Sequence, residues 1–276
     1  MIENRPAALF VCGGTGEFFS LNLEEYRVLV GAAAEAADGQ CPVIAGTGYG
    51  AALAAKFAEA AEEAGADGLL VFPPYLIQPE QDGLEEHYRR IAASTSLGLI
   101  LYQRDNAIFA PATVGRLSQI KNIVGFKDGL GDMERLLRIQ REAGGRLAIL
   151  NGMPTAELSA PAFLGLGVLN YSSAVFNFVP DIARAFYQAL RKDDRVAINR
   201  LLDAFYRPLA QLRERRKGYA VALIKAGLRV VGKPAGNVRP PLVDCNDKEE
   251  AELKVMIEAG QAVIQNLAPV SRSPRS

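Results

Sequence analysis

The segments GLILY at residues 98–102 and IVGFK at residues 123–127 decide the fold, because each is a short, almost wholly apolar run that ends in a polar side chain. Continuous apolar runs are typical of strands buried on both faces, as in a parallel sheet. Five further runs share this pattern: Ala8–Cys12, Pro42–Ala45, Gly68–Phe72, Leu147–Asn151 and Gly167–Tyr171. The sequence therefore predicts seven buried parallel strands.

A stretch with apolar residues at helical spacing follows each of these runs. The first, Leu23–Ala37, comes directly after Asn22, a favoured N-cap residue. The others are Ala51–Ala64, Gly83–Ala93, Ala112–Gln119, Asp132–Ala143, Thr155–Gly165 and Pro180–Arg191. Parallel strands joined by helices define an α/β architecture with right-handed crossovers.

Such a sheet can stay open and doubly wound, or it can close into a (β/α)₈ barrel, which needs one strand more than the seven runs. The sequence GGTGE at residues 13–17 lacks the G-x-G-x-x-G spacing of a dinucleotide-binding fold. Polar residues stand near the C-terminal ends of many runs, among them Thr15, Tyr75, Tyr102, Lys127 and Ser172. In a barrel these ends converge on one mouth, where active sites form, so we expect a (β/α)₈ TIM barrel.

The pattern changes after Arg191, where strands no longer alternate with helices. The segments Asp194–Glu214, Gly218–Val231 and Lys248–Leu267 are predicted to be helices without strands between them. We therefore predict a barrel at residues 1–192, a C-terminal helical appendix at residues 193–268 and a disordered tail at residues 269–276.

The composition excludes several classes of function. Lys plus Arg and Asp plus Glu both number 31, and this zero net charge argues against a nucleic-acid binder. One histidine and three cysteines without metal-ligand spacing argue against a zinc site, a serine-protease triad and a disulfide framework. We expect the cysteines to be buried small apolar residues and His87 to be a solvated residue of a helix.

Neither secretion nor membrane insertion is indicated. The N-terminus lacks a basic region followed by a long apolar stretch, so it does not resemble a signal peptide. The 23 uncharged residues between Glu157 and Asp181 could span a bilayer, but Pro161, Gly165 and Asn170 are among the residues that interrupt them. We expect a cytoplasmic protein.

Lys127 is the most informative single residue, because it ends a run that should be buried. Burying an ammonium group is costly and lowers its pKa. A lysine that is partly neutral can act as a nucleophile and form a Schiff base with a ketone. The alternative is a strand-end lysine that reaches solvent or pairs with Asp128.

Tyr102 ends the preceding run and should lie one strand away from Lys127. Its hydroxyl could relay a proton, or it could pack at the rim of the barrel. The amides around Gly14 and the hydroxyl of Thr15 could hold a carboxylate, although the same loop could be a simple tight turn. Arg104 could bind a second carboxylate through two hydrogen bonds or be an ordinary surface arginine.

Other strand ends supply further candidates for substrate contacts. Ser172 and Ser173 could donate hydrogen bonds to substrate oxygens, or they could cap the helix that follows. Asn151 is another candidate for substrate binding, and Tyr75 is a possible accessory residue.

Taken together, four motifs resemble the dihydrodipicolinate synthase / N-acetylneuraminate lyase superfamily over roughly residues 8 to 245. They are GGTGE at 13–17, PPY at 73–75, Tyr102 at a strand end and GFKD at 125–128. Longer strings resemble a dehydratase branch of that superfamily: GGTGEFFSL at 13–21, YQRDNA at 102–107, NGMPT at 151–155 and YSSAVFN at 171–177.

The resemblance implies a barrel with three C-terminal helices, Lys127 as the Schiff-base lysine, Tyr102 as the proton relay, and Gly14 and Thr15 in a carboxylate-binding loop. It also implies dehydration and decarboxylation of a six-carbon keto-dicarboxylate sugar acid without a metal or organic cofactor. A homo-oligomer, dimer or tetramer, is expected, with neither a nucleic acid nor a membrane as partner. A sibling 2-keto acid aldolase or synthase and a non-catalytic binding paralogue are the alternatives.

Two features depart from the family pattern. Gln103 stands after Tyr102 where the family usually has asparagine. In addition, Ala8–Cys12 resembles the second strand of the family, so the first strand–helix unit is expected to be missing and the complete gene product to extend further at its N-terminus. A barrel without one strand exposes two sheet edges.

Overall fold

Seven parallel strands pair side by side in the order of the chain in the computed structural model, which describes residues 1–267. They are β1 (Leu9–Val11), β2 (Val43–Thr47), β3 (Gly68–Val71), β4 (Gly98–Gln103), β5 (Ile123–Asp128), β6 (Ala148–Asn151) and β7 (Asn170–Tyr171). Each lies within or overlaps a predicted run, although β7 is limited to the last two residues of its run. In the described residues β1 pairs only with β2 and β7 only with β6, so both are edge strands.

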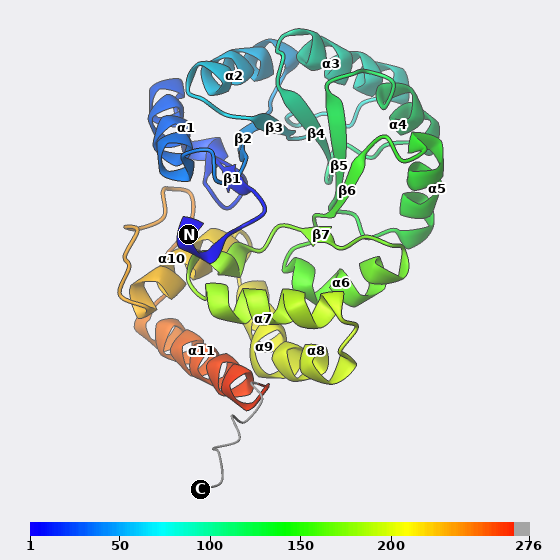
Figure 1. The fold of residues 1–276 in the computed structure, drawn as a ribbon. Coiled ribbons are helices and arrows are strands. Elements are labelled where there is room, and N and C mark those ends of the chain that lie inside the picture. Colours follow the sequence, from blue (N-terminus) through cyan, green and yellow to red (C-terminus); the bar gives the residue numbers. More distant parts are fainter. Residues whose placement is uncertain (268–276) are drawn as a thin grey trace, which may run out of the picture. The chain divides into compact units, whose positions relative to one another are not determined.

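The predicted helices alternate with these strands, and Figure 1 shows α1 to α5 following one another around the outside of the curled sheet. Their bounds are α1 (Leu23–Ala37), α2 (Ala51–Glu63), α3 (Gln81–Ala93), α4 (Pro111–Leu117), α5 (Met133–Ala143) and α6 (Ala156–Gly165). Asn22 caps α1 through a reciprocal pair of hydrogen bonds with Glu25, which explains why this helix begins where the sequence predicts.

The hydrophobic core of this unit, Met1–Ser172, includes apolar side chains of both helices and strands. Phe126 of β5 is fully buried there and meets Phe109 edge-on, with ring centroids 5.7 Å apart. Successive side chains of a strand point to opposite faces. Lys127 therefore points away from the side on which Phe126 and Asp128 lie.

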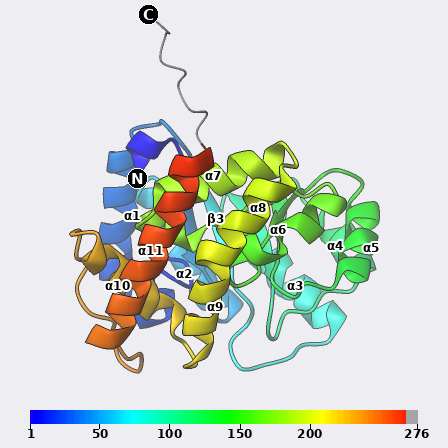
Figure 2. The ribbon, with the colours of Figure 1, turned by 90° about the horizontal axis from the view of Figure 1, so that it is seen from below.

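The second unit, Ser173–Ser276, is helical where it is described. Its elements are the short 3₁₀ helix η3 (Ala174–Asn177), α7 (Pro180–Arg191), α8 (Arg195–Leu201), the π-helical turn η4 (Leu202–Tyr206), α9 (Arg207–Glu214), α10 (Ala220–Val230) and α11 (Asp247–Leu267). Figure 2 shows α11 lying along α8 and α9, with which it is in contact.

The long helix predicted at Asp194–Glu214 is interrupted by η4, and Pro208 explains the interruption. Proline has no N–H to donate and its ring clashes with the carbonyl four residues earlier, so the helix widens by one residue there. The domain boundary predicted at residue 192 stays a prediction, and α7 is assigned to the second unit. The tail predicted at residues 269–276 lies outside the described residues.

Three expectations about individual segments can be compared with the structure. All three cysteines are buried and unpaired, as predicted. The solvated His87 was a wrong prediction: its Nε2 is buried without a partner among residues 1–267, and its ring packs edge-on against Tyr88. The reason is that His87 lies three residues after buried Leu84, at the margin of the buried stripe of α3. Among the described helices none is long and apolar enough to cross a bilayer.

Candidate functional site

Tyr102 and Lys127 lie side by side at the C-terminal ends of β4 and β5, where the strand register pairs them directly. The Nζ atom of Lys127 is 4.5 Å from the centre of the Tyr102 ring. It is also 5.2 Å from the centre of the ring of Phe10, which belongs to β1. Since β1 and β5 are not neighbours in the sheet, this contact shows that the sheet curls so that distant strands converge on Lys127.

Lys127 carries a buried amine without a counter-ion. Its residue surface is only 7% exposed, and within residues 1–267 no ion pair involves it. The predicted alternative of an ion pair with Asp128 was wrong, because Asp128 points to the opposite face and accepts hydrogen bonds from Gln103 Nε2 and Gly131 N. Burial, and secondly the charge of Arg104, lowers the pKa of Lys127 to about 8. About a tenth of the amine is then neutral at pH 7.

Tyr102 is suited to donate a proton. It is 7% exposed, and its hydroxyl donates a hydrogen bond to the backbone oxygen of Gly152 at 2.9 Å. Burial raises the pKa of Tyr102, although the nearby Arg104 acts in the opposite direction. The Arg104 guanidinium lies 5.5 Å from the Tyr102 ring centre. The phenol is therefore protonated at neutral pH.

Gly152, the residue after β6, touches both of these side chains, and its role was not predicted. A Cβ atom there would lie 2.7 Å from Lys127 Cγ and 2.9 Å from Tyr102 Cε2, closer than any real contact allows. Its N–H donates to the backbone oxygen of Asp128 at 2.6 Å. The NGMPT string at residues 151–155 contained this glycine, but sequence spacing could not show which side chains it meets.

The GGTGE segment is a tight turn that leaves two amides open. Gly13 O accepts hydrogen bonds from Gly16 N at 3.1 Å and Phe18 N at 3.2 Å. Gly14 and Thr15 are exposed, and within the described part of the chain neither donates its backbone N–H to a protein acceptor. The loop is thus a tight turn, and its two open N–H groups are of the kind that can hold a carboxylate, so that role stays a prediction.

A row of aromatic rings joins this loop to the site. Phe18 stacks on Phe72 with ring centroids 5.5 Å apart, and Phe72 lies 6.0 Å from the Tyr102 ring. The loop after β1 and the ends of β3 and β4 therefore belong to one packed group.

The remaining candidates have different surroundings. Arg104 is half exposed, with Nε 2.5 Å from Asp105 Oδ2. Tyr75 is 66% exposed and packs edge-on against Tyr49. Ser172 follows β7 and is half-buried, whereas Ser173 belongs to the second unit and directly precedes η3. The structure thus brings Arg104 to the Tyr102 ring, and the roles of all four residues in substrate binding stay predictions.

The side chain of Asn151 forms hydrogen bonds within the segment that follows β6. The side chain is buried, and its amide donates hydrogen bonds to Ala156 O and Ser159 Oγ, while its oxygen accepts one from Met153 N. In the sheet Asn151 pairs with Asp128, one position beyond Lys127 and its partner Leu150. By alternation it shares the face of Asp128, and a role in substrate binding stays a prediction.

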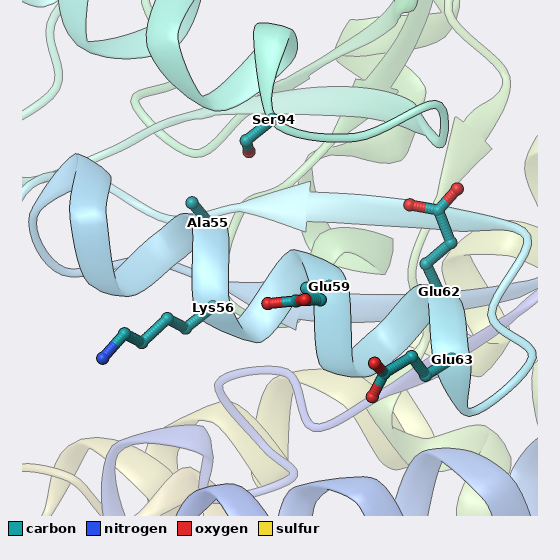
Figure 3. Close-up of a pocket in the computed structure, with 6 residues that line it drawn as sticks. All are labelled: Ala55, Lys56, Glu59, Glu62, Glu63 and Ser94. Atoms are coloured by element: carbon teal, nitrogen blue, oxygen red, sulfur yellow. The ribbon is translucent and has the colours of Figure 1, made fainter.

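A surface pocket of about 500 Å³ lies elsewhere, against α2 and the end of α3. Figure 3 shows the side chains that line it: Ala55, Lys56, Glu59, Glu62, Glu63 and Ser94. Glu62 already accepts hydrogen bonds from Thr95 and Ser96. No group of acidic, histidine or cysteine side chains in residues 1–267 suits a metal ion. The buried amine of Lys127 therefore marks the candidate active site better than this acidic hollow does.

Comparison with known proteins agrees with the barrel architecture. Residues 1–260 match the Dihydrodipicolinate synthetase family, and the chain belongs to that family. The predicted resemblance and the α/β-barrel fold are thus confirmed. A solved 4-hydroxy-tetrahydrodipicolinate synthase from Methylacidiphilum fumariolicum is 30% identical with a TM-score of 0.85, and the match covers 96% of this chain and 88% of that one.

The names of two curated relatives indicate a particular reaction. The probable 5-dehydro-4-deoxyglucarate dehydratase 1 of Streptomyces avermitilis is 50% identical over 268 residues, which cover 96% of this chain and 86% of the relative. The probable 5-dehydro-4-deoxyglucarate dehydratase of Bradyrhizobium diazoefficiens is 50% identical over 258 residues, which cover 93% and 82%. These names agree with the dehydratase branch expected from the longer motifs.

Proposed function

We propose that this chain is a Schiff-base lyase that converts 5-dehydro-4-deoxyglucarate into 2,5-dioxopentanoate, CO₂ and water. The observation that carries the proposal is the buried amine of Lys127, which has no counter-ion in the described residues and lies 4.5 Å from the Tyr102 ring. Lowered pKa values are what amine nucleophiles require. The names of the relatives that are half identical supply the substrate.

Catalysis begins when neutral Lys127 attacks the ketone beside one carboxylate of the substrate. The carbinolamine that forms loses water and becomes an iminium ion, with Tyr102 relaying the proton. The positive nitrogen acidifies the neighbouring CH₂ group, and loss of a proton from it gives an enamine. Lys127 itself thus supplies the electron sink, and the proposal invokes no metal or organic cofactor.

The enamine then expels the hydroxyl group next to the former CH₂, which leaves as water after taking a proton from Tyr102 or a bound water. The product is a conjugated iminium ion. The C–C bond to the far carboxylate breaks, its electron pair flows into this iminium, and CO₂ leaves. Protonation and hydrolysis release 2,5-dioxopentanoate and return Lys127 to its free amine.

Substrate binding is assigned to residues around the mouth. Gly14 and Thr15 would hold the carboxylate beside the ketone through their free N–H groups. Arg104 and Ser173 would contact the distal carboxylate and hydroxyl groups, with Ser172 and Asn151 as further contacts and Tyr75 as an accessory residue. The proposal includes a homo-oligomer, dimer or tetramer, in the cytoplasm, with neither nucleic acid nor membrane as partner.

Borohydride trapping tests this function. Turnover of 5-dehydro-4-deoxyglucarate should release one CO₂ per substrate, and borohydride added during turnover should leave a substrate-derived adduct on Lys127 and abolish activity. Lys127→Arg keeps the charge but has no accessible neutral amine, so it should be folded and inactive. Lys121→Arg, an exposed position just before the same strand, is the matched control and should remain active.

Three results would contradict parts of the proposal. Activity in Lys127→Arg, or an adduct on Lys225 or Lys233, would mean that the nucleophile is misassigned. Pyruvate formation without CO₂ would indicate an aldolase sibling. The assignment of Lys127 as the nucleophile would then stand, but the assigned reaction would be wrong. Binding of the keto acid without any adduct or turnover would indicate a non-catalytic paralogue.

A further inference from the structure

A buried polar pair, Gln103 and Asp128, lies directly behind the candidate catalytic residues. The register of β4 and β5 pairs Gln103 with Asp128 just as it pairs Tyr102 with Lys127. Because side chains alternate, the two pairs lie on opposite faces of the same two strands. Neither Gln103 nor Asp128 has any exposed surface, and Gln103 Nε2 donates to Asp128 Oδ1 at 2.7 Å.

The strand register at this point depends on a local contact. Leu99 pairs with Ile123 but Ile100 pairs with Gly125, so β5 carries one extra residue, Val124, at the start of the pairing. The first part of the ladder therefore does not fix which residue lies opposite Tyr102. A slip of one residue would send Lys127 to the other face of the sheet. The bond from Gln103 to Asp128 fixes the register beside the site itself.

The same pair also holds the loops that follow the two strands. Gln103 Oε1 accepts a hydrogen bond from Phe109 N at 3.0 Å, which closes the loop that carries Arg104. Asp128 Oδ2 accepts one from Gly131 N at 3.0 Å. The polar atoms of both side chains are thus satisfied, as buried groups require. A change in either residue leaves a buried group without its partner and moves a loop.

We propose that Gln103, acting through Asp128, is a positioning residue that keeps Tyr102 beside Lys127. The proposal rests on the roles proposed above for Tyr102 and Lys127. Gln103 faces away from Lys127, so it acts only through the placement of other groups. Without the bond, Lys127 can still attack the ketone, but the phenol is misplaced and the proton transfers that it relays become slower. Misplacement by about 1 Å can cost about 10²-fold in rate.

Isosteric substitutions test this inference without changing volume. Gln103→Glu sets two carboxyl groups against each other. In Asp128→Asn the new amide NH₂ must face either Gln103 Nε2 or Gly131 N, both of which are donors. The double variant reverses the bond: Asn at 128 donates to Glu at 103, which can still accept from Phe109 N. We expect kcat to fall by about 10- to 100-fold in each single variant while KM stays within about threefold. The double variant should regain most of the lost kcat.

Trapping and stability measurements separate positioning from folding. Borohydride should still trap the adduct on Lys127 in both single variants, although more slowly, because the nucleophile is unchanged and only the proton transfers relayed by Tyr102 are impaired. Single variants that lose thermal stability but keep kcat per folded molecule would overturn the inference, and so would a rise in KM at constant kcat. An adduct that is absent from Lys127 in the unsubstituted protein would instead refute the proposed function, which keeps the two failures distinct.

Discussion

Two buried ionisable side chains, Lys127 in the first unit and Glu249 in the second, have opposite surroundings. Glu249 is 5% exposed and is surrounded by partners: Tyr219 OH and Asn246 N donate to it, and Arg216 lies 3.0 Å away. Lys127 is 7% exposed, yet in the described residues its amine has no ion-pair partner and lies against the faces of two aromatic rings. A buried charge is costly unless it is paired.

The pKa values of Glu249 and Lys127 both lie below their ordinary values, but for opposite reasons. Burial alone would raise the pKa of Glu249, but the hydrogen bond from Tyr219 and the other partners outweigh it and lower that pKa, which stabilises the charged form. For Lys127 burial itself lowers the pKa, which marks a destabilised charged form. The paired carboxylate of Glu249 thus stabilises the folded state. The unpaired amine of Lys127 lowers the stability of the folded state, but it can act as a nucleophile.

The largest expected effect comes from Lys127→Met, which should reduce turnover to background and still stabilise the protein. A pKa lowered from 10.5 to about 8 corresponds to about 3 kcal/mol of stability lost at pH 7. The unfolded chain holds the proton between these pH values and the native protein does not, so native stability rises as pH goes from 8 to 10.5. Urea unfolding of both proteins at pH 7 and pH 10 should show the gap closing.

Tyr102→Phe should give the next largest effect, a loss of about 10²–10⁴-fold in kcat, because a positioned proton relay is removed. The phenyl ring keeps its contacts with Phe72 and Lys127, so the protein should fold and borohydride should still trap an adduct on Lys127, although more slowly. The measurement is steady-state kinetics with borohydride trapping in parallel. Near-normal turnover would leave Tyr102 as a packing residue only.

Much of this site follows from the sequence, and the missing part has a physical reason. The apolar runs with polar ends predict the strands. Alternation along β5, which the structure shows, is the reason why the expected alternative of a Lys127–Asp128 ion pair was wrong. The contacts of Gly152 and the Gln103–Asp128 bond depend on how β4, β5 and β6 are aligned, and the β4–β5 pairing includes a bulge at Val124. Sequence periodicity does not reveal such a bulge. The π-helical turn before Pro208 could not be predicted for a similar reason, since a proline indicates that a helix is interrupted but not what form the interruption takes.

Glu249→Gln should lower stability by about 1–3 kcal/mol at pH 7, because the buried Tyr219 hydroxyl and Arg216 lose their charged partner. The folded pKa of Glu249 lies below its ordinary value, so this stabilisation is present above pH 4.5 and is lost as pH falls through the folded pKa. The matched control is Glu252→Gln, whose ion pair with Arg215 is exposed, so that its loss should lower stability much less. Thermal unfolding at pH 7 and pH 3 measures both, and equal losses in the two variants would contradict the comparison.

Arg104→Gln should have the smallest effect and tests the origin of the Lys127 pKa. Burial is the larger cause of the lowered pKa of Lys127 and the charge of Arg104 the smaller, so removing that charge should raise the pKa of Lys127. Imine formation then requires a higher pH. Pyruvate is a suitable probe because it has no distal carboxylate for Arg104 to bind, and borohydride reports the trapped fraction against pH.

The midpoint of this trapping curve should move upward in Arg104→Gln and stay in place in Arg116→Gln, whose side chain pairs with Glu85 on the surface. A midpoint that stays near pH 8 in both variants would mean that burial alone sets the reactivity of Lys127. A downward shift would mean that Arg104 acts on Lys127 through some contact other than its charge, since removing a nearby positive charge can only favour the ammonium form. The direction of this small shift in the trapping midpoint therefore decides whether burial alone makes Lys127 reactive or whether the positive charge of Arg104 also contributes.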